Sequence, residues 1–171
     1  MSNLNEIIKK INSLKDDDIW RLYGYVGTEL RTRKLIRTRN IVGERGEFLA
    51  IKSYNTIAGL PNLQAAPEGT QNVDALSRKG ERYSIKTITA PGSTTGVFYG
   101  LGNLGDQDLP EQKFEFVVLV VIDKNYNLKK IFELSWKQFL KYRKWHKTMR
   151  AWNLSITKAL SAEAKIIISE K

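Results

Sequence analysis

The chain has 171 residues, a length typical of one domain with a substantial buried core. Lys and Arg number 28 against 18 Asp and Glu, and the net charge of +10 favours a polyanionic partner, nucleic acid first and an anionic membrane surface second. The absence of Cys excludes thiolate nucleophiles, disulfides and Cys-ligated zinc, and the single His, His146, excludes multi-His metal sites.

Neither a membrane span nor a secretory signal is expected. No apolar run approaches the roughly 20 residues that a membrane-spanning helix needs. Residues 1–6 lack the basic segment and the continuous apolar run of a signal peptide. Because the lack of Cys also fits a reducing compartment, we expect a cytoplasmic protein.

The N-terminal third has the pattern of helices. Apolar residues recur at helical spacing at Leu4, Ile7, Ile11 and Leu14, and again at Ile19, Leu22, Val26 and Leu30. Asp16 to Asp18 are expected to supply capping carboxylates to the second helix. We predict a single domain in which residues 1–35 form a helical segment, a candidate dimerisation element, and residues 36–171 form the core.

A basic stretch and a third predicted helix follow. The basic residues, which suit phosphate binding, are Arg31, Arg33, Lys34, Arg37 and Arg39. Asn40 is a plausible N-cap for a helix that ends at about Tyr54. That helix carries Glu44 and Glu47, which lie three residues apart and therefore share one face.

The most informative segment is a predicted hairpin. Residues 58–71 are rich in Gly and Pro and predict a loop, and residues 72–77 and 82–89 then predict two strands around a turn at Lys79-Gly80. Because side chains alternate along a strand, Ser84 and Lys86 should share one polar face, while Tyr83 and Ile85 face the core. The hairpin brings Asp74 and Lys86 to neighbouring strands.

The rest of the chain predicts a central sheet. Residues 90–110 suit a long surface loop, 114–122 a strand covered on both faces, and 128–134 its partner. Residues 136–145 predict a helix, whereas 153–160 and 164–169 do not reveal their type. We therefore expect an α/β or α+β fold, with a mixed central sheet flanked by helices.

Asp74 followed by Ser84-Ile85-Lys86 resembles the motif of the restriction-endonuclease-like PD-(D/E)XK nuclease superfamily, and the hairpin layout resembles that of small type II restriction endonucleases. That motif consists of an Asp, a spacer, an acidic residue, any residue and Lys. The resemblance covers roughly residues 36–146. Ser84 departs from it, since it stands where the superfamily usually has Glu or Asp.

The resemblance implies a site for Mg²⁺, with Mn²⁺ as a substitute. Asp74 is the implied central metal ligand, the backbone carbonyl of Ile85 a further ligand, and Lys86 the group that positions the attacking water and balances phosphate charge. We expect Glu47 to supply the carboxylate that position 84 lacks, and Ser84 to donate a hydrogen bond to a water on the metal.

Each of these residues also has a simpler interpretation. Glu44 and Glu47 can form a salt-bridged surface beside the neighbouring Arg residues, and for Glu44 this interpretation is favoured. His146 suits a structural role or a phosphate contact better than a catalytic base. Residues 137–150 mix basic and aromatic side chains, which fits either an amphipathic helix or a nucleic-acid surface.

Further DNA contacts are expected outside the motif. Lys144 and Lys147 carry positive charge in the segment 137–150. Polar residues of the loop after Lys86 are candidates for contacts with base edges or phosphates, as the resemblance implies: Ser93, Thr94, Thr95, Tyr99 and Asn103.

The function expected from the sequence is magnesium-dependent hydrolysis of double-stranded DNA, with a type II restriction endonuclease as the specific role. Because one site cuts one strand, we also expect a homodimer. Two alternatives keep the same fold: a catalytically inactive DNA-binding module, which Ser84 favours, and a repair or junction nuclease. An RNA-binding or structural protein is a third alternative that the charge permits.

Overall fold

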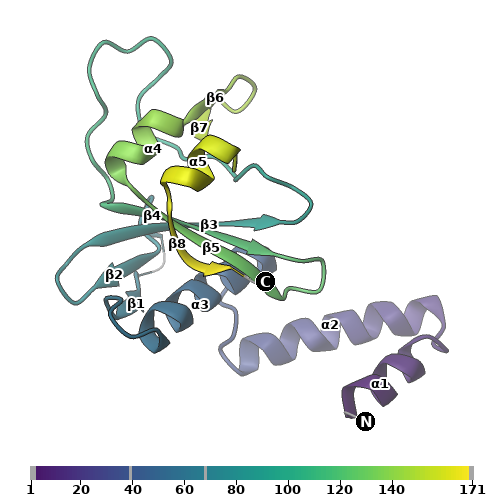
Figure 1. Ribbon diagram of the computed structural model, residues 1–171. Helices are drawn as coiled ribbons and strands as arrows, with labels where there is room; N and C mark the ends of the chain where they lie inside the picture. Colours follow the sequence, from purple (N-terminus) through teal and green to yellow (C-terminus); the bar gives the residue numbers. More distant parts are fainter. Residues whose placement is uncertain (1–2, 39, 68, 170–171) are drawn as a thin grey trace. The chain divides into compact units, whose positions relative to one another are not determined.

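The computed structural model describes residues 3–38, 40–67 and 69–169. The chain divides into two compact units, Met1–Arg39 and Asn40–Lys171 (Figure 1). The boundary between them falls a few residues after the predicted one at 35/36. Each unit is described by itself below.

The N-terminal unit contains helices α1 (Asn3–Ile11) and α2 (Asp16–Thr32). The N-cap residue of α2 is Lys15, whose side chain makes no capping hydrogen bond. The prediction that Asp16 to Asp18 cap the helix is therefore wrong. These carboxylates lie inside the first turn, where the helix dipole favours negative charge.

Apolar side chains of the helical unit stay exposed. None of the described residues of α1 and α2 is buried, and Leu4 and Ile7 expose 61% and 46% of their surface. Ile11 is half-buried, and Leu14 exposes 40%. Among the described residues, no helix combines the length and the apolar composition that crossing a membrane requires.

The second unit is built on a mixed sheet flanked by helices, as predicted. Its strand order is β1-β2-β3-β4-β5-β8. The strands are β1 (Leu63–Ala65), β2 (Ala75–Ser77), β3 (Arg82–Thr89), β4 (Phe116–Ile122), β5 (Leu128–Ser135) and β8 (Lys165–Ser169). β3 and β4 are parallel, and the other neighbouring pairs are antiparallel. Parallel neighbours need a crossover of a dozen or more residues, which accounts for the long segment 90–115 between these two strands.

The sheet is covered on both faces. On β4, Val117 and Leu119 pack into one apolar cluster with Phe98 and Phe114 of the crossover, while Val118 and Val120 pack into the other with α3 (Ile41–Thr56). Side chains alternate along a strand, so each face of β4 meets a different layer. The prediction of a strand covered on both faces is confirmed.

Helix α3 is fixed at both ends. The side chain of Asn40 accepts a hydrogen bond from the backbone N–H of Gly43, which confirms the predicted N-cap. Near the other end, the Tyr54 hydroxyl donates to Glu133 Oε2 over 2.5 Å, and Lys165 Nζ lies 3.1 Å from Glu133 Oε1. Burial, together with the charge of Glu133, raises the pKa of Tyr54, so the hydroxyl remains a donor.

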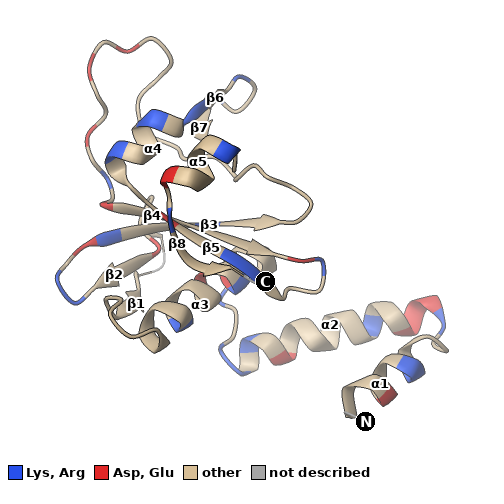
Figure 2. Ribbon diagram, in the orientation of Figure 1, with Lys and Arg blue, Asp and Glu red and all other residues tan. Residues whose placement is uncertain are grey.

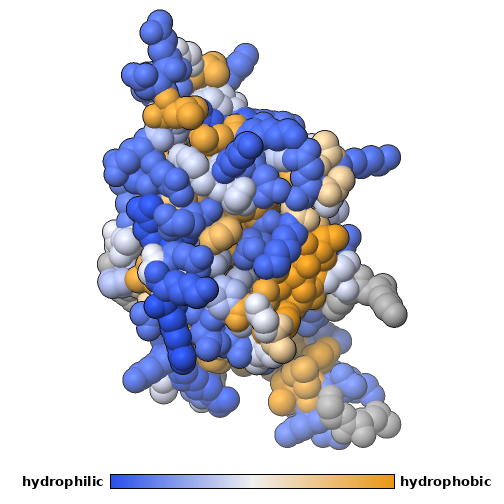
Figure 3. Space-filling view, turned by 60° about the vertical axis from the view of Figure 1, so that its left-hand side comes forward, coloured by the Kyte–Doolittle hydropathy of each residue, from blue (hydrophilic) through white to orange (hydrophobic). Residues whose placement is uncertain are grey.

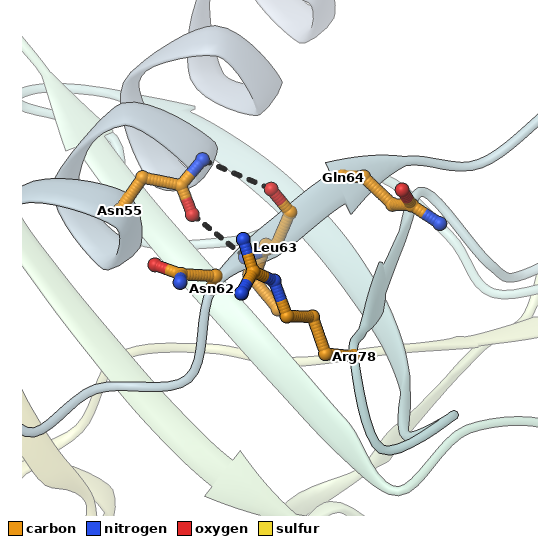
Figure 4. A pocket seen from close by; sticks show the side chains of 5 residues that line it. All are labelled: Asn55, Asn62, Leu63, Gln64 and Arg78. Atoms are coloured by element: carbon orange, nitrogen blue, oxygen red, sulfur yellow. Dashed lines mark hydrogen bonds between the residues drawn. The ribbon is translucent and has the colours of Figure 1, made fainter.

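Two predicted elements differ from the structure. The helix expected over 136–145 ends earlier, as α4 (Trp136–Tyr142), because Arg143 adopts an extended backbone. Residues beyond it form a two-stranded ribbon of β6 (Lys144–His146) and β7 (Ala151–Asn153). A short helix, α5 (Lys158–Glu163), precedes β8. The expected loop 58–71 contains the strand β1. The Asn55 side-chain amide donates to the Leu63 carbonyl and accepts from the Leu63 N–H (Figure 4).

Candidate functional site

Asp74 is held rigidly at the start of the hairpin. It directly precedes β2, and its backbone continues the ladder: its N–H donates to the Tyr83 carbonyl and its carbonyl accepts from Ala66. Its carboxylate oxygen Oδ2 accepts the backbone N–H of Ile85 over 2.7 Å. Among the described residues no donor bonds Oδ1, so this oxygen remains available to a cation.

The backbone carbonyl of Ile85 points toward the side of β3 on which Asp74 lies. In a strand, the N–H and C=O of one residue point to the same neighbour, and the Ile85 N–H points to Asp74. The ladder between β2 and β3 pairs Ala75 with Tyr83 and Leu76 with Arg82, and it does not extend to Ile85. The Ile85 carbonyl is therefore directed toward the Asp74 side of β3, while its side chain enters the core.

Ser84 is sealed inside the protein. Its residue is 0% exposed, and its hydroxyl donates to Asp74 Oδ2 over 3.4 Å. This differs from the expected hydrogen bond to a water on the metal, because no surface of Ser84 is open to such a water. The alternation of Ser84 and Lys86 against Tyr83 and Ile85 holds, but the face that carries Ser84 is covered rather than open.

Lys86 reaches the opposite layer from Ile85. Its Nζ lies 5.1 Å from the centre of the Phe98 ring, which stabilises an ammonium by a cation–π interaction. Phe98 is itself fixed, since its backbone exchanges hydrogen bonds with Trp152 of β7. The lysine is half-buried and stays beside the hairpin carboxylate.

One pocket brings the expected groups together. It has a volume of about 340 Å³, and its wall includes Glu47 from α3, Asp74, Ile85 and Lys86. Asn40, Val42, Gly43, Thr87, Gly96 and Val97 complete the wall. The pocket thus joins a carboxylate from α3 to a carboxylate and an ammonium from the hairpin, and Gly96 and Val97 of the crossover form part of its wall. Glu44, in contrast, is buried and does not line the pocket.

The sequence analysis missed several of these wall residues. Gly96 and Val97 lie in the crossover, and no periodic pattern indicates which part of a long loop approaches the sheet. Gly43 could have been identified from the sequence. A Gly inside a helix destabilises it by about 0.5–1 kcal/mol relative to Ala, so its presence there indicates a local structural requirement. Here the reason is steric, because a Cβ on Gly43 would meet the Asn40 side chain.

The crossover residues expected to contact DNA fall into two groups. Thr95 is buried, and its hydroxyl donates to Gly96 and accepts from the Leu154 N–H over 3.0 Å. Its expected role in DNA contact is therefore not supported, because these bonds hold the crossover in place. Thr94 bonds the Ser155 hydroxyl at the surface. The other three, Ser93, Tyr99 and Asn103, are exposed.

Basic residues lie in both units (Figure 2). In the helical unit, Arg33 pairs with Glu29 over 2.6 Å, Arg31 bonds Thr28, and Lys34 adopts a positive φ after α2. Arg37 is described, whereas Arg39 lies outside the described residues.

In the core, Lys144 lies on β6 and Lys147 in the turn after it, both exposed. They are not on the predicted helix, so the amphipathic-helix interpretation fails beyond Tyr142. His146 Nδ1 accepts the Met149 N–H, a structural role in the turn. Hydrophilic residues cover most of the face drawn in Figure 3.

A second pocket of about 320 Å³ opens beside β1 and is lined by Asn55, Asn62, Leu63, Gln64 and Arg78 (Figure 4). Its wall contains one cation and no carboxylate, so it lacks the carboxylates by which Mg²⁺ is commonly held. None of the site residues predicted from the sequence lies in its wall.

The donor set of the first pocket suits Mg²⁺. Mg²⁺ is commonly held by one or two carboxylates, with waters and phosphate oxygens completing its octahedron. Asp74, Glu47 and the Ile85 carbonyl match this preference for oxygen ligands. Among the described residues there is no group of three or more His, Cys, Asp or Glu side chains that could hold a metal ion, so the proposed site has two carboxylates and a backbone carbonyl.

Comparisons of the chain with protein-family models and with curated proteins found no match.

Proposed function

We propose that the chain is a magnesium-dependent endonuclease that hydrolyses phosphodiester bonds of double-stranded DNA in the cytoplasm, as a restriction endonuclease of type II. The observation that carries the proposal is the pocket in which Asp74, Glu47 and Lys86 meet. Two anionic groups and one cation in a single depression suit a metal ion and a phosphate together. The net charge of +10 supports a polyanionic substrate.

The proposed role of each residue in the pocket follows from its charge. Asp74 and Glu47 would hold the cation, with Mn²⁺ as a substitute for Mg²⁺, and the Ile85 carbonyl would add a neutral oxygen. A bound ion would supply Lewis acidity to the scissile phosphate and would lower the pKa of a water. Lys86 places a compact positive charge beside the phosphate. The hydrogen bond from the Ile85 N–H keeps the Asp74 carboxylate oriented before any ligand arrives.

A twofold dimer is the simplest assembly for cutting both strands with one site per chain. The exposed apolar side chains of α1, among them Leu4 and Ile7, are the surface proposed to join the two copies.

The second candidate is an inactive DNA-binding module, or a repair or junction nuclease with the same core. The inactive module is favoured by one observation, the buried neutral Ser84 beside Asp74. A hydroxyl with no open surface does not replace a carboxylate ligand. If Glu47 does not bind the metal, Asp74 alone provides the negative charge of the site.

Incubation of purified protein with plasmid DNA, with and without Mg²⁺, separates these candidates. We expect cleavage that requires the metal and is lost in Asp74→Ala and Lys86→Ala, because these residues act on the metal and the water. DNA binding should survive in both variants, as a filter-binding assay at low salt would show. Metal-independent cleavage, or full activity in either variant, would refute the proposal, and binding without cleavage by the parent would support the inactive module.

A further inference from the structure

Helix α3 touches β3 at one unusually close point. A Cβ added to Gly46 would lie 2.9 Å from Thr87 Cβ and 3.1 Å from Thr87 Cγ2, and it would overlap Thr87 Oγ1. Real Cβ atoms are not found at the shorter of these separations, so position 46 accommodates only Gly while Thr87 keeps its place. Gly46 is buried, and it lies in the middle of a helix, where Gly is otherwise unfavourable.

Both residues of the contact are next in sequence to residues of the proposed site. Glu47 directly follows Gly46 on α3, and Thr87 directly follows Lys86 on β3. Ile85, two residues before Thr87, donates the hydrogen bond that fixes Asp74. Any change in the separation of α3 and β3 at this point therefore changes the distance between the Glu47 and Asp74 carboxylates.

The Thr87 side chain acts here through its volume. Its Oγ1 is buried and has no hydrogen-bond partner among the described residues. An atom with almost no accessible surface is not placed to contact a ligand in the pocket, although other atoms of Thr87 line the pocket wall. Leaving a buried hydroxyl unpaired is unfavourable, because the group loses its hydrogen bonds to water and gains none in return. The hydroxyl is thus unfavourable for folding at this position, while the bulk of the side chain sets the spacing.

We infer that Thr87 is a positioning residue, and that its contact with Gly46 sets the distance across which Glu47 and Asp74 share one divalent cation. The inference rests on the proposed function, because it assumes that both carboxylates bind the same ion. It assigns no chemical step to Thr87.

The test compares side chains of different volume at the contact. The probe is Mn²⁺, titrated into DNA-free protein by calorimetry, so that binding is measured apart from activity. Gly46→Ala should weaken Mn²⁺ binding on the order of tenfold, the lower end of what is found for groups that orient metal ligands. Thr87→Ala should also weaken Mn²⁺ binding, because it removes the side chain that sets the spacing between α3 and β3. Thr87→Val should bind Mn²⁺ as the parent does, because it keeps the volume of that side chain.

The double variant Gly46→Ala/Thr87→Ala provides a second comparison, and an affinity no higher than that of the single variants would overturn the inference. It moves a methyl group from the strand to the helix and should regain part of the lost affinity. Recovery should be incomplete, since the two Cβ atoms remain 2.9 Å apart without a shift of the backbone. Gly24→Ala is the matched control, because Gly24 lies in helix α2 with open space around it, and this variant should bind Mn²⁺ normally.

The outcomes are distinct. Parent-like affinity in both Gly46→Ala and Thr87→Ala would overturn the inference, and so would a loss of affinity in Thr87→Val, which would show that the hydroxyl matters. If Gly46→Ala does not fold, the comparison of Thr87→Ala with Thr87→Val still tests whether the volume of the side chain at position 87 controls Mn²⁺ binding. A parent protein that cleaves DNA while these variants bind Mn²⁺ normally refutes the inference alone. A parent that neither binds Mn²⁺ nor cleaves refutes both the inference and the proposed function.

Discussion

At the scale of residues, side-chain alternation predicted which groups share a face of β3, but not what covers that face. Ser84 and Lys86 lie on the layer opposite Tyr83 and Ile85, as a period of two requires. The sequence could not indicate that Ser84 is buried or that Phe98 of the crossover lies against Lys86, because contacts between distant segments leave no local pattern. The same holds for Thr95. Its neighbours in the sequence have the composition of a surface loop, but Thr95 itself is buried.

Thr95 gives a direct test at this scale. Thr95→Val should lower the free energy of unfolding by about 1–3 kcal/mol, because the Leu154 N–H loses its acceptor in a buried place. Thr94→Ala, one residue earlier but exposed, should cost less than about 0.5 kcal/mol. Urea denaturation of both variants measures the difference. Equal small losses would show that Thr95 does not hold the crossover as described.

At the scale of elements, segments with a strong local signal were predicted correctly and short ones were not. The cap at Asn40, the hairpin and the pair of β4 and β5 all follow from spacing, turn residues and β-branched runs. β1 has only three residues, and it depends on the amide of Asn55, so nothing near it in the sequence indicates a strand. β6 pairs with β7 where a helix was predicted, because tertiary pairing overrides local propensity.

The start of β3 is joined to the residue before β4 by an ion pair, which makes the stability of this junction depend on pH. Glu115 accepts hydrogen bonds from the backbone and side chain of Arg82, and the guanidinium lowers the pKa of the Glu115 carboxyl. A carboxyl whose pKa is lower in the folded chain contributes stability above its unfolded pKa of about 4.3. That contribution is lost as the pH falls through the folded pKa.

Glu115→Gln tests this linkage. The free energy of unfolding should fall less steeply below about pH 4.3 in the variant than in the parent, because the amide has no proton to gain. Urea denaturation over a pH series measures both curves. Other carboxyls with lowered pKa, such as Glu163 and Asp123, titrate in both proteins and cancel in the difference. Curves that stay parallel would contradict the assigned role of Arg82.

At the scale of the whole molecule, the proposal of a DNA partner rests on charge rather than on fold. The excess of basic residues was evident from composition, and the pocket of carboxylates lies within an otherwise basic chain. Composition did not indicate the division into two compact units. The sequence predicted one domain that includes a helical segment at its N-terminus. Packing within each unit, and not any linker of unusual composition, marks the boundary.

The salt dependence of DNA binding belongs to this scale. Each phosphate that is neutralised contributes about −0.9 to the slope of log affinity against log salt concentration, so we expect a steep slope for duplex DNA. Charge reversal across Arg31, Arg33, Lys34, Arg37 and Arg39 should flatten it. Fluorescence anisotropy over a salt series measures the slope. An unchanged slope would place the phosphate contacts elsewhere, with residues 137–150 as the next candidate surface.

The central claim is that Glu47 and Asp74 together hold one metal ion without help from position 84. The most direct measurement is plasmid cleavage by Glu47→Gln and Ser84→Ala, with Mg²⁺ titrated over a wide range and folding checked by circular dichroism. Glu47→Gln should lose cleavage or require far more Mg²⁺, because a charged ligand is removed while the shape of the pocket is kept. Ser84→Ala should remain close to the parent, because it removes a 3.4 Å hydrogen bond and no ligand. Normal cleavage by Glu47→Gln together with severe loss in Ser84→Ala would contradict the claim.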